Sequence, residues 1–227
     1  MAHWIELTAA EGFKFPAYEA RPTGRAKGAV VVLQEIFGVN AHIRSVADGF
    51  AALGFLAVAP ATFHRVKPDV ELGYTPDDIA AGVALKAAVE ALPAPGVMQD
   101  IQAAIDYAAK VGKVGLVGYC WGGLLTWRAA CHLSGLRAAV PYYGGGMTSP
   151  AEIARTPICP VLVHLGDHDP SIPQAGVAAF QQAQPQVEVQ IYQAGHGFNC
   201  DHRSAYDAAA ATLARERTLA FFTRHLA

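Results

Sequence analysis

Short apolar runs alternate with segments of helical pattern along almost the whole chain, and this alternation restricts the possible folds more than any other feature. Residues 28–33 read Gly-Ala-Val-Val-Val-Leu, the continuous apolar pattern of a strand that is buried on both faces. Further strands are expected at 55–59, 113–117, 137–142, 160–164 and 187–192. Helices are expected at 40–53, 76–92, 97–109, 121–133, 173–182 and 203–225. Strands that alternate with helices in this way form a mainly parallel sheet with helices on both faces.

The N-terminal segment departs from the alternation. Residues 4–8 and 15–20 are expected to pair as a hairpin around Ala10-Glu11-Gly12, which brings the sheet to about eight strands. No repeat, low-complexity tract or linker divides residues 1–227, so we expect a single α/β domain. In an open parallel sheet the ligand site lies beyond the C-terminal ends of the strands, and the reactive residues are therefore expected there.

Composition excludes several classes of protein. The net charge is -2 and no basic stripe is present, so nucleic acid is not an expected partner. The apolar runs are far shorter than the roughly 20 residues that a membrane span needs, and the N-terminal residues do not form the pattern of a signal peptide. The four cysteines, Cys120, Cys131, Cys159 and Cys200, show no CxxC spacing and do not indicate a disulfide framework. We expect a cytoplasmic protein with reduced thiols.

The sequence Gly118-Tyr119-Cys120-Trp121-Gly122 lies between an expected strand and an expected helix. This is the context of a nucleophile elbow, with cysteine in the place of serine. The two glycines leave room at a sharp turn where a Cβ would clash, and the start of a helix favours the thiolate form. A cysteine after a strand is more often a small buried hydrophobic residue. The flanking glycines and the change from strand to helix favour the catalytic interpretation.

A thiol nucleophile needs a base, and the base needs an acidic side chain to orient it. In α/β hydrolases the acid and then the histidine follow the nucleophile along the chain. His196 stands between two glycines after the last expected strand, and we interpret it as the base. Asp167 and Asp169 both follow the strand at 160–164, and either could orient His196 or cap the next helix. Their spacing does not separate them.

A metal site is the alternative interpretation of four polar side chains in this region, His164, Asp167, His168 and Asp169. Side chains so close in sequence do not easily converge on one ion, and His164 belongs to the expected strand. We therefore expect neither a metal nor another cofactor.

Two backbone N–H groups are needed to bind the oxyanion of a tetrahedral intermediate. In this type of fold one belongs to the residue after the nucleophile, here Trp121, and the other to the loop after an early strand, where Ile36 is the candidate. The same loop contains Glu35 at the end of a buried strand. A buried carboxylate without a partner is costly, so Glu35 must be paired. We expect either a structural salt bridge to an arginine such as Arg44, or a contact with the Cys120 thiol or an arginine at the site.

Four segments together resemble the dienelactone hydrolase family of α/β hydrolases. They are residues 34–40 (QEIFGVN), 118–123 (GYCWGG), 166–173 (GDHDPSIP) and 195–198 (GHGF), in order over most of the chain. The resemblance implies the α/β-hydrolase fold and a triad of Cys120, His196 and Asp169. It also implies that Glu35 helps to switch the thiol between a resting and a reactive state. Members of the family open the enol-lactone ring of carboxymethylenebutenolide during aromatic degradation, without a cofactor.

The sequence departs from this family where the substrate carboxylate should be bound. Residues 66–112 contain no arginine, and the position four past His196 is Cys200, with Arg203 further on. Arg203 either binds the substrate or is a solvated residue at the start of a helix. Other residues expected to contact the substrate are Phe37, Tyr119 and Phe198.

We therefore expect a hydrolase that opens an enol-lactone or ester through a thioacyl intermediate. A broader carboxylesterase or thioesterase with the same triad is the alternative among enzymes, and a ligand-binding relative without turnover is the alternative outside them. A redox-sensing role for Cys120 is less favoured, because no resolving cysteine is adjacent in sequence. The expected partner is a small-molecule lactone or ester, and the expected state is a monomer or small homo-oligomer.

Overall fold

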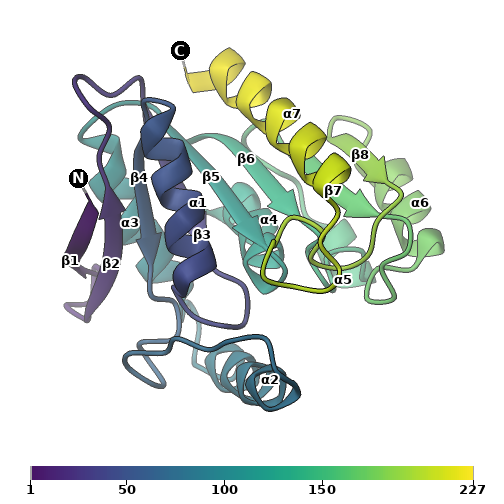
Figure 1. The fold of residues 1–227 in the computed structure, drawn as a ribbon, viewed down its shortest axis with the longest axis horizontal. Coiled ribbons are helices and arrows are strands. Elements are labelled where there is room, and N and C mark those ends of the chain that lie inside the picture. Colours follow the sequence, from purple (N-terminus) through teal and green to yellow (C-terminus); the bar gives the residue numbers. More distant parts are fainter. Residues whose placement is uncertain (1, 227) are drawn as a thin grey trace.

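A computed structural model describes residues 2–226, which form a sheet with the strand order β1-β2-β4-β3-β5-β6-β7-β8 (Figure 1). Strands β1 and β2 pair antiparallel, β2 also runs antiparallel to β4, and the remaining pairs are parallel. The strands are β1 (Ala2–Thr8), β2 (Lys14–Ala20), β3 (Ala29–Leu33), β4 (Leu56–Pro60), β5 (Val114–Tyr119), β6 (Leu136–Tyr142), β7 (Leu162–Gly166) and β8 (Glu188–Tyr192). The prediction of a mainly parallel sheet of about eight strands is confirmed.

Helices cover both faces of this sheet. Helices α1 and α7 pack on one face and α3 and α4 on the other, while α2 lies beyond the ends of the strands (Figure 1). The helices are α1 (Ala41–Ala52), α2 (Pro76–Glu90), α3 (Met98–Ala109), α4 (Trp121–His132), α5 (Pro150–Ile153), α6 (Gln174–Ala183) and α7 (Ala208–Leu226). Two of the helices have capped N-terminal ends, since Asn40 accepts a hydrogen bond from the Ile43 N–H and Thr75 forms a capping box with Asp78. None of the helices in the described residues is long and apolar enough to cross a membrane.

The central strands are buried along their whole length, as their continuous apolar sequences predict. Every residue of β3, β4, β5 and β7 is buried, and the apolar side chains form one core that extends from Leu7 to Leu226. The register aligns the C-terminal ends of these strands, because Leu33 pairs with Gly118 and Tyr119 with Tyr142. The loops that follow β3, β5, β7 and β8 therefore emerge at one edge of the sheet.

The last helix begins later than the sequence pattern predicts, and the prediction that it starts at Arg203 is wrong. Helix α7 begins at Ala208, after Asp207 accepts a hydrogen bond from the Ala210 N–H at 2.9 Å. The Asp207 N–H itself donates to the Phe198 carbonyl oxygen at 3.0 Å. Residues 203–207 thus lie outside the helix, and Arg203 is not a helix-start residue. The sequence pattern also missed the short helix α5.

Candidate active site

The turn between β5 and α4 holds Cys120 in a conformation that few residues adopt. Its φ is 55° and its ψ is -118°, and strain of this kind costs on the order of 1–3 kcal/mol. A Cβ at Gly118 would lie 2.2 Å from the Gly122 carbonyl oxygen, and a Cβ at Gly122 would lie 2.4 Å from the Gln34 carbonyl oxygen. Only glycine fits at these two positions. The Cys120 thiol is thereby presented at the N-terminal end of α4.

His196 and Asp169 are joined by a short hydrogen bond. His196 lies in the loop after β8, and its Nδ1 is 2.7 Å from Oδ2 of Asp169, which lies in the loop after β7. The Asp169 side chain is fully buried, and its second oxygen accepts the Ser171 N–H at 2.8 Å. Asp167 instead accepts the Ala194 N–H at 3.2 Å. The geometry therefore places Asp169, and not Asp167, against the imidazole.

The pKa of His196 reports the surroundings of its ring. Burial lowers this pKa, but hydrogen bonds to Asp169 and to Cys120, with the charges of the same two groups, raise it to about 10. The ring is therefore stabilised as an imidazolium between a carboxylate and a thiol. Part of this stabilisation depends on Cys120, so it changes whenever the charge of that sulfur changes. Cys120, His196 and Asp169 form one interacting group.

Glu35 is buried beside this group and is paired with an arginine of the site. Its Oε1 accepts a hydrogen bond from Nη1 of Arg203 at 3.1 Å, and its Oε2 accepts one from the Tyr74 hydroxyl at 3.3 Å. Arg44, the structural alternative, pairs with Glu71 at 2.7 Å. Burial lowers the pKa of Arg203, but the charges of Glu35, Cys120 and Tyr143 and the hydrogen bond to Glu35 together raise it further than burial lowers it. Arg203 is thus a largely buried cation of the site.

The residues whose backbone N–H groups are the expected oxyanion donors, Ile36 and Trp121, line the same cavity as Cys120. Ile36 stands in the loop after β3, and Trp121 is the first residue of α4. Neither N–H has a backbone acceptor among residues 2–226, so both are free to bind an oxyanion. The Trp121 side chain is fixed, because its Nε1 donates to Glu90 at 3.0 Å and its ring stacks on Phe63 with centroids 5.1 Å apart.

A cavity of about 580 Å³ opens over the thiol, within the size range of small-molecule sites. Six of the predicted site residues line it: Ile36, Phe37, Cys120, Trp121, His196 and Arg203. The other four do not. Glu35 and Asp169 are buried and act through Arg203 and His196, which do line the cavity. Tyr119 and Phe198 are buried away from it and pack against Tyr142 and Tyr143. These two aromatic residues belong to the buried packing beneath the site and do not contact the cavity.

One wall of the cavity was missed by sequence reasoning. Helix α2 contributes Ile79, Val83, Lys86 and Glu90, which recur at the spacing of one helix face. Ile79 and Val83 are 41% and 53% exposed, a property that only the structure gives, so no sequence signal marked this wall. Lys86 has no ion-pair partner among the described residues, whereas Arg128 of α4, which also lines the cavity, is held by Glu152 at 2.8 Å.

The side chains considered as a metal site do not converge. His164 is inside β7, where its ring bonds to Tyr192 and Thr218. In residues 2–226 a different group brings its ligand atoms close together, namely Glu35, His42 and Cys200.

Comparison with known proteins gives a consistent picture. A model of the dienelactone hydrolase family matches residues 15–226. A protein of Salmonella typhimurium named "Putative carboxymethylenebutenolidase" is 36% identical and covers 95% of this chain and 84% of its own length. A protein of the same name from Synechocystis sp. is 37% identical, over 87% of this chain and 86% of its own. A crystal structure described as a putative dienelactone hydrolase from Klebsiella pneumoniae is 32% identical, covers 99% of both chains and superposes with a TM-score of 0.81.

Proposed function

Because the chain belongs to the dienelactone hydrolase family of α/β hydrolases, we propose that it opens an enol-lactone or ester of the dienelactone class through a thioacyl-enzyme intermediate. One observation carries the proposal. Cys120 stands on a strained turn and interacts with an imidazole whose other nitrogen is bonded to a buried carboxylate. Cys120 is the nucleophile, His196 the proton carrier and Asp169 the residue that orients it.

In the first step the Cys120 thiolate attacks the carbonyl carbon and forms a bond to it. The oxyanion that develops is bound by the N–H groups of Ile36 and Trp121. The tetrahedral intermediate then collapses, the bond from the carbonyl carbon to the ring oxygen breaks, and His196 gives its proton to that oxygen. In a lactone the leaving oxygen remains attached to the acyl group, so the whole opened substrate is held as a thioester.

In the second step the charge of Cys120 helps to determine whether the His196 imidazole is protonated. Once the sulfur is acylated its negative charge is gone, and so is part of the effect that raises the pKa of His196. A neutral imidazole then takes a proton from water, and the hydroxide attacks the thioester. Asp169 stabilises the imidazolium that forms, and the thiolate leaves as the product acid is released.

Recognition of an anionic substrate is supported by the charges on the cavity walls. Arg203 can exchange its bond to Glu35 for a substrate carboxylate, and Lys86 offers a second positive charge from α2. A substrate that draws Arg203 away leaves Glu35 in need of another partner close to the thiol. We propose that this exchange is how Glu35 takes part in switching Cys120 to its reactive state.

A broader carboxylesterase or thioesterase is the second candidate, and the apolar part of the cavity wall favours it. Ile79, Val83 and Leu124 form an apolar surface that neutral acyl groups could occupy. A panel of substrates separates the two candidates. A dienelactone hydrolase turns over the anionic lactone with a higher kcat/KM than neutral aryl esters, whereas a broad esterase shows the opposite order.

The test of the proposed chemistry compares Cys120→Ala with Cys131→Ala, a buried cysteine near the end of the same helix. Both proteins are incubated with cis- and trans-dienelactone and with aryl esters. We expect Cys120→Ala to lose at least about 10⁴-fold in kcat and Cys131→Ala to remain close to the parent protein. Full turnover by Cys120→Ala would show that the nucleophile is wrongly assigned. Absence of turnover by the parent protein would favour a ligand-binding relative.

A further inference from the structure

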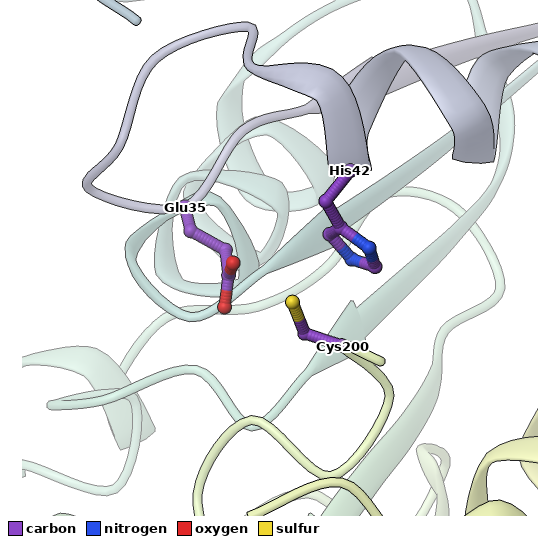
Figure 2. Close-up of side chains that lie close together, drawn as sticks. All are labelled: Glu35, His42 and Cys200. Atoms are coloured by element: carbon purple, nitrogen blue, oxygen red, sulfur yellow. The ribbon is translucent and has the colours of Figure 1, made fainter. Parts of the chain in front are cut away.

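Three buried side chains that bind metals in other proteins come together beside the active site (Figure 2). Glu35 comes from the loop after β3, His42 from the first turn of α1, and Cys200 from the loop after β8. Their ligand atoms all lie within 4.8 Å of one another, and the residues are 1%, 4% and 0% exposed. We propose that they bind one divalent transition-metal cation of the zinc class.

The surroundings of His42 are those of a metal-binding histidine. Its Nδ1 lies 3.4 Å from a carboxylate oxygen of Asp201, and a carboxylate on the second nitrogen is the usual arrangement when a ring binds a metal. Its Nε2 is buried and has no hydrogen-bond partner in the described part of the chain. An unpaired buried nitrogen is costly, and a bound ion would satisfy it.

The donor set selects the kind of ion. Sulfur and imidazole nitrogen favour Zn²⁺, Co²⁺ and copper, whereas Mg²⁺ and Ca²⁺ prefer sites made entirely of oxygen. Tetrahedral zinc, with bonds of about 2.0–2.3 Å, holds its ligand atoms about 3.3–3.8 Å apart. The three side chains, whose ligand atoms lie within 4.8 Å of one another, must therefore close in by at most about 1.5 Å, and a water molecule can occupy the fourth position.

The charges around the site permit an ion but limit its affinity. Glu35 is bonded to Arg203 and Tyr74, and Tyr74 is also hydrogen-bonded to Cys200. On binding, the metal takes the place of the Cys200 thiol proton, which is released to solvent. The two charges of the ion are then balanced by the thiolate and by Glu35. Arg203 remains as a positive neighbour that has lost its carboxylate.

A second cavity gives the ion a route to His42. This cavity, of about 220 Å³, lies between α1 and α7 and is lined by His42, Asp201, Tyr119 and Arg215. It is distinct from the cavity over Cys120, whose lining does not include His42. An ion can therefore reach the cluster without passing the nucleophile.

Occupation of the site has a consequence for catalysis, which rests on the proposed function. A metal that holds Glu35 prevents that carboxylate from exchanging partners with Arg203. Hydrolysis is therefore expected to fall as the site fills, with the same midpoint as metal binding.

The experiment titrates Co²⁺ into the full-length, chelator-treated protein and follows absorbance. A thiolate bound to Co²⁺ gives a charge-transfer band in the near ultraviolet, and we expect it to saturate at one equivalent. Cys200→Ala and His42→Gln should both abolish the band. Cys120→Ala should retain it, because the catalytic sulfur is not a ligand. Zn²⁺ should displace Co²⁺ and remove the band.

Each outcome decides between this site and others. The proposal is overturned if the parent protein gives no band, or if the band is lost in Cys120→Ala and kept in Cys200→Ala, which would place the ion on the triad. Circular dichroism of each variant shows whether it has folded, and His42→Gln carries the test if Cys200→Ala does not fold. Turnover by the metal-free protein without any band refutes the metal site alone. A band without turnover refutes the hydrolase function alone.

Discussion

Replacing Asp169 by asparagine should impair the enzyme far more than the same change at Asp167. The two residues are close in sequence and were not separated by the sequence pattern, but only Asp169 contacts His196, at 2.7 Å. Asparagine has nearly the same shape and no charge, so it does not stabilise the imidazolium. Its amide can also donate to Nδ1, which leaves the proton on the nitrogen that should receive one from the thiol or from water.

The size of the effect follows from the pKa of His196. The ordinary value is 6.5 and the value in the folded protein is about 10, a net difference worth about 5 kcal/mol that remains after burial has opposed the effects of Asp169 and Cys120. Loss of the Asp169 charge should lower the pKa of His196 and reduce kcat by on the order of 10³–10⁴. Asp167→Asn keeps an oxygen for the Ala194 N–H, so its kcat should fall by less than about tenfold.

The assay is steady-state turnover of one aryl ester and one dienelactone by both variants, with the His196 ring titrated by NMR. We expect the ring of Asp169→Asn to titrate at lower pH than in the parent protein, and that of Asp167→Asn to be nearly unchanged. Equal losses in the two variants, or a greater loss for Asp167→Asn, would refute the assignment of the orienting carboxylate.

Three further predictions concern stability and the turn at Cys120. Arg203→Met leaves the buried Glu35 without its cation and should cost about 3–5 kcal/mol in urea unfolding, and adding Glu35→Gln should restore most of it; additive losses in the double variant would contradict the pairing. Burial lowers the pKa of His164 to about 3, below the 6.5 expected in the unfolded chain. The stability that this neutral ring contributes above pH 6.5 is therefore lost as pH falls, by about 3 kcal/mol at pH 4.5. His164→Asn should abolish this dependence, and an unchanged acid profile would count against it. Gly122→Ala places a Cβ 2.4 Å from the Gln34 carbonyl oxygen and should lower both Tm and kcat, at a cost of about 1–3 kcal/mol; a variant as stable and active as the parent would show that the turn tolerates a side chain.

The parts of the site that depend on local sequence could be predicted, and those that depend on packing could not. The turn at Cys120 is set by two glycines between a buried strand and a helix, so the pattern alone was sufficient. The parallel strands bring their C-terminal ends together whatever the loops contain, which placed His196 and the two aspartates near the thiol. The choice of Asp169 required coordinates, because both carboxylates follow the same strand.

Arg203 shows why the remaining features were not predictable. The periodic pattern of α7 continues back to Arg203 in the sequence. Only the hydrogen bonds of Asp207 make the helix begin at Ala208. The contribution of Lys86 depends on how α2 packs across the edge of the sheet, which no local signal specifies. The approach of His42 to Cys200 likewise joins distant segments through the tertiary fold.

The central claim is that Cys120 carries the acyl group, and pre-steady-state hydrolysis of a slowly deacylated aryl ester tests it most directly. We predict a burst of the aryl alcohol equivalent to one per active molecule, and an acid-quenched protein whose acyl mass maps to the peptide containing Cys120. An acyl group found on another residue, or a burst that survives in Cys120→Ala, would contradict the account.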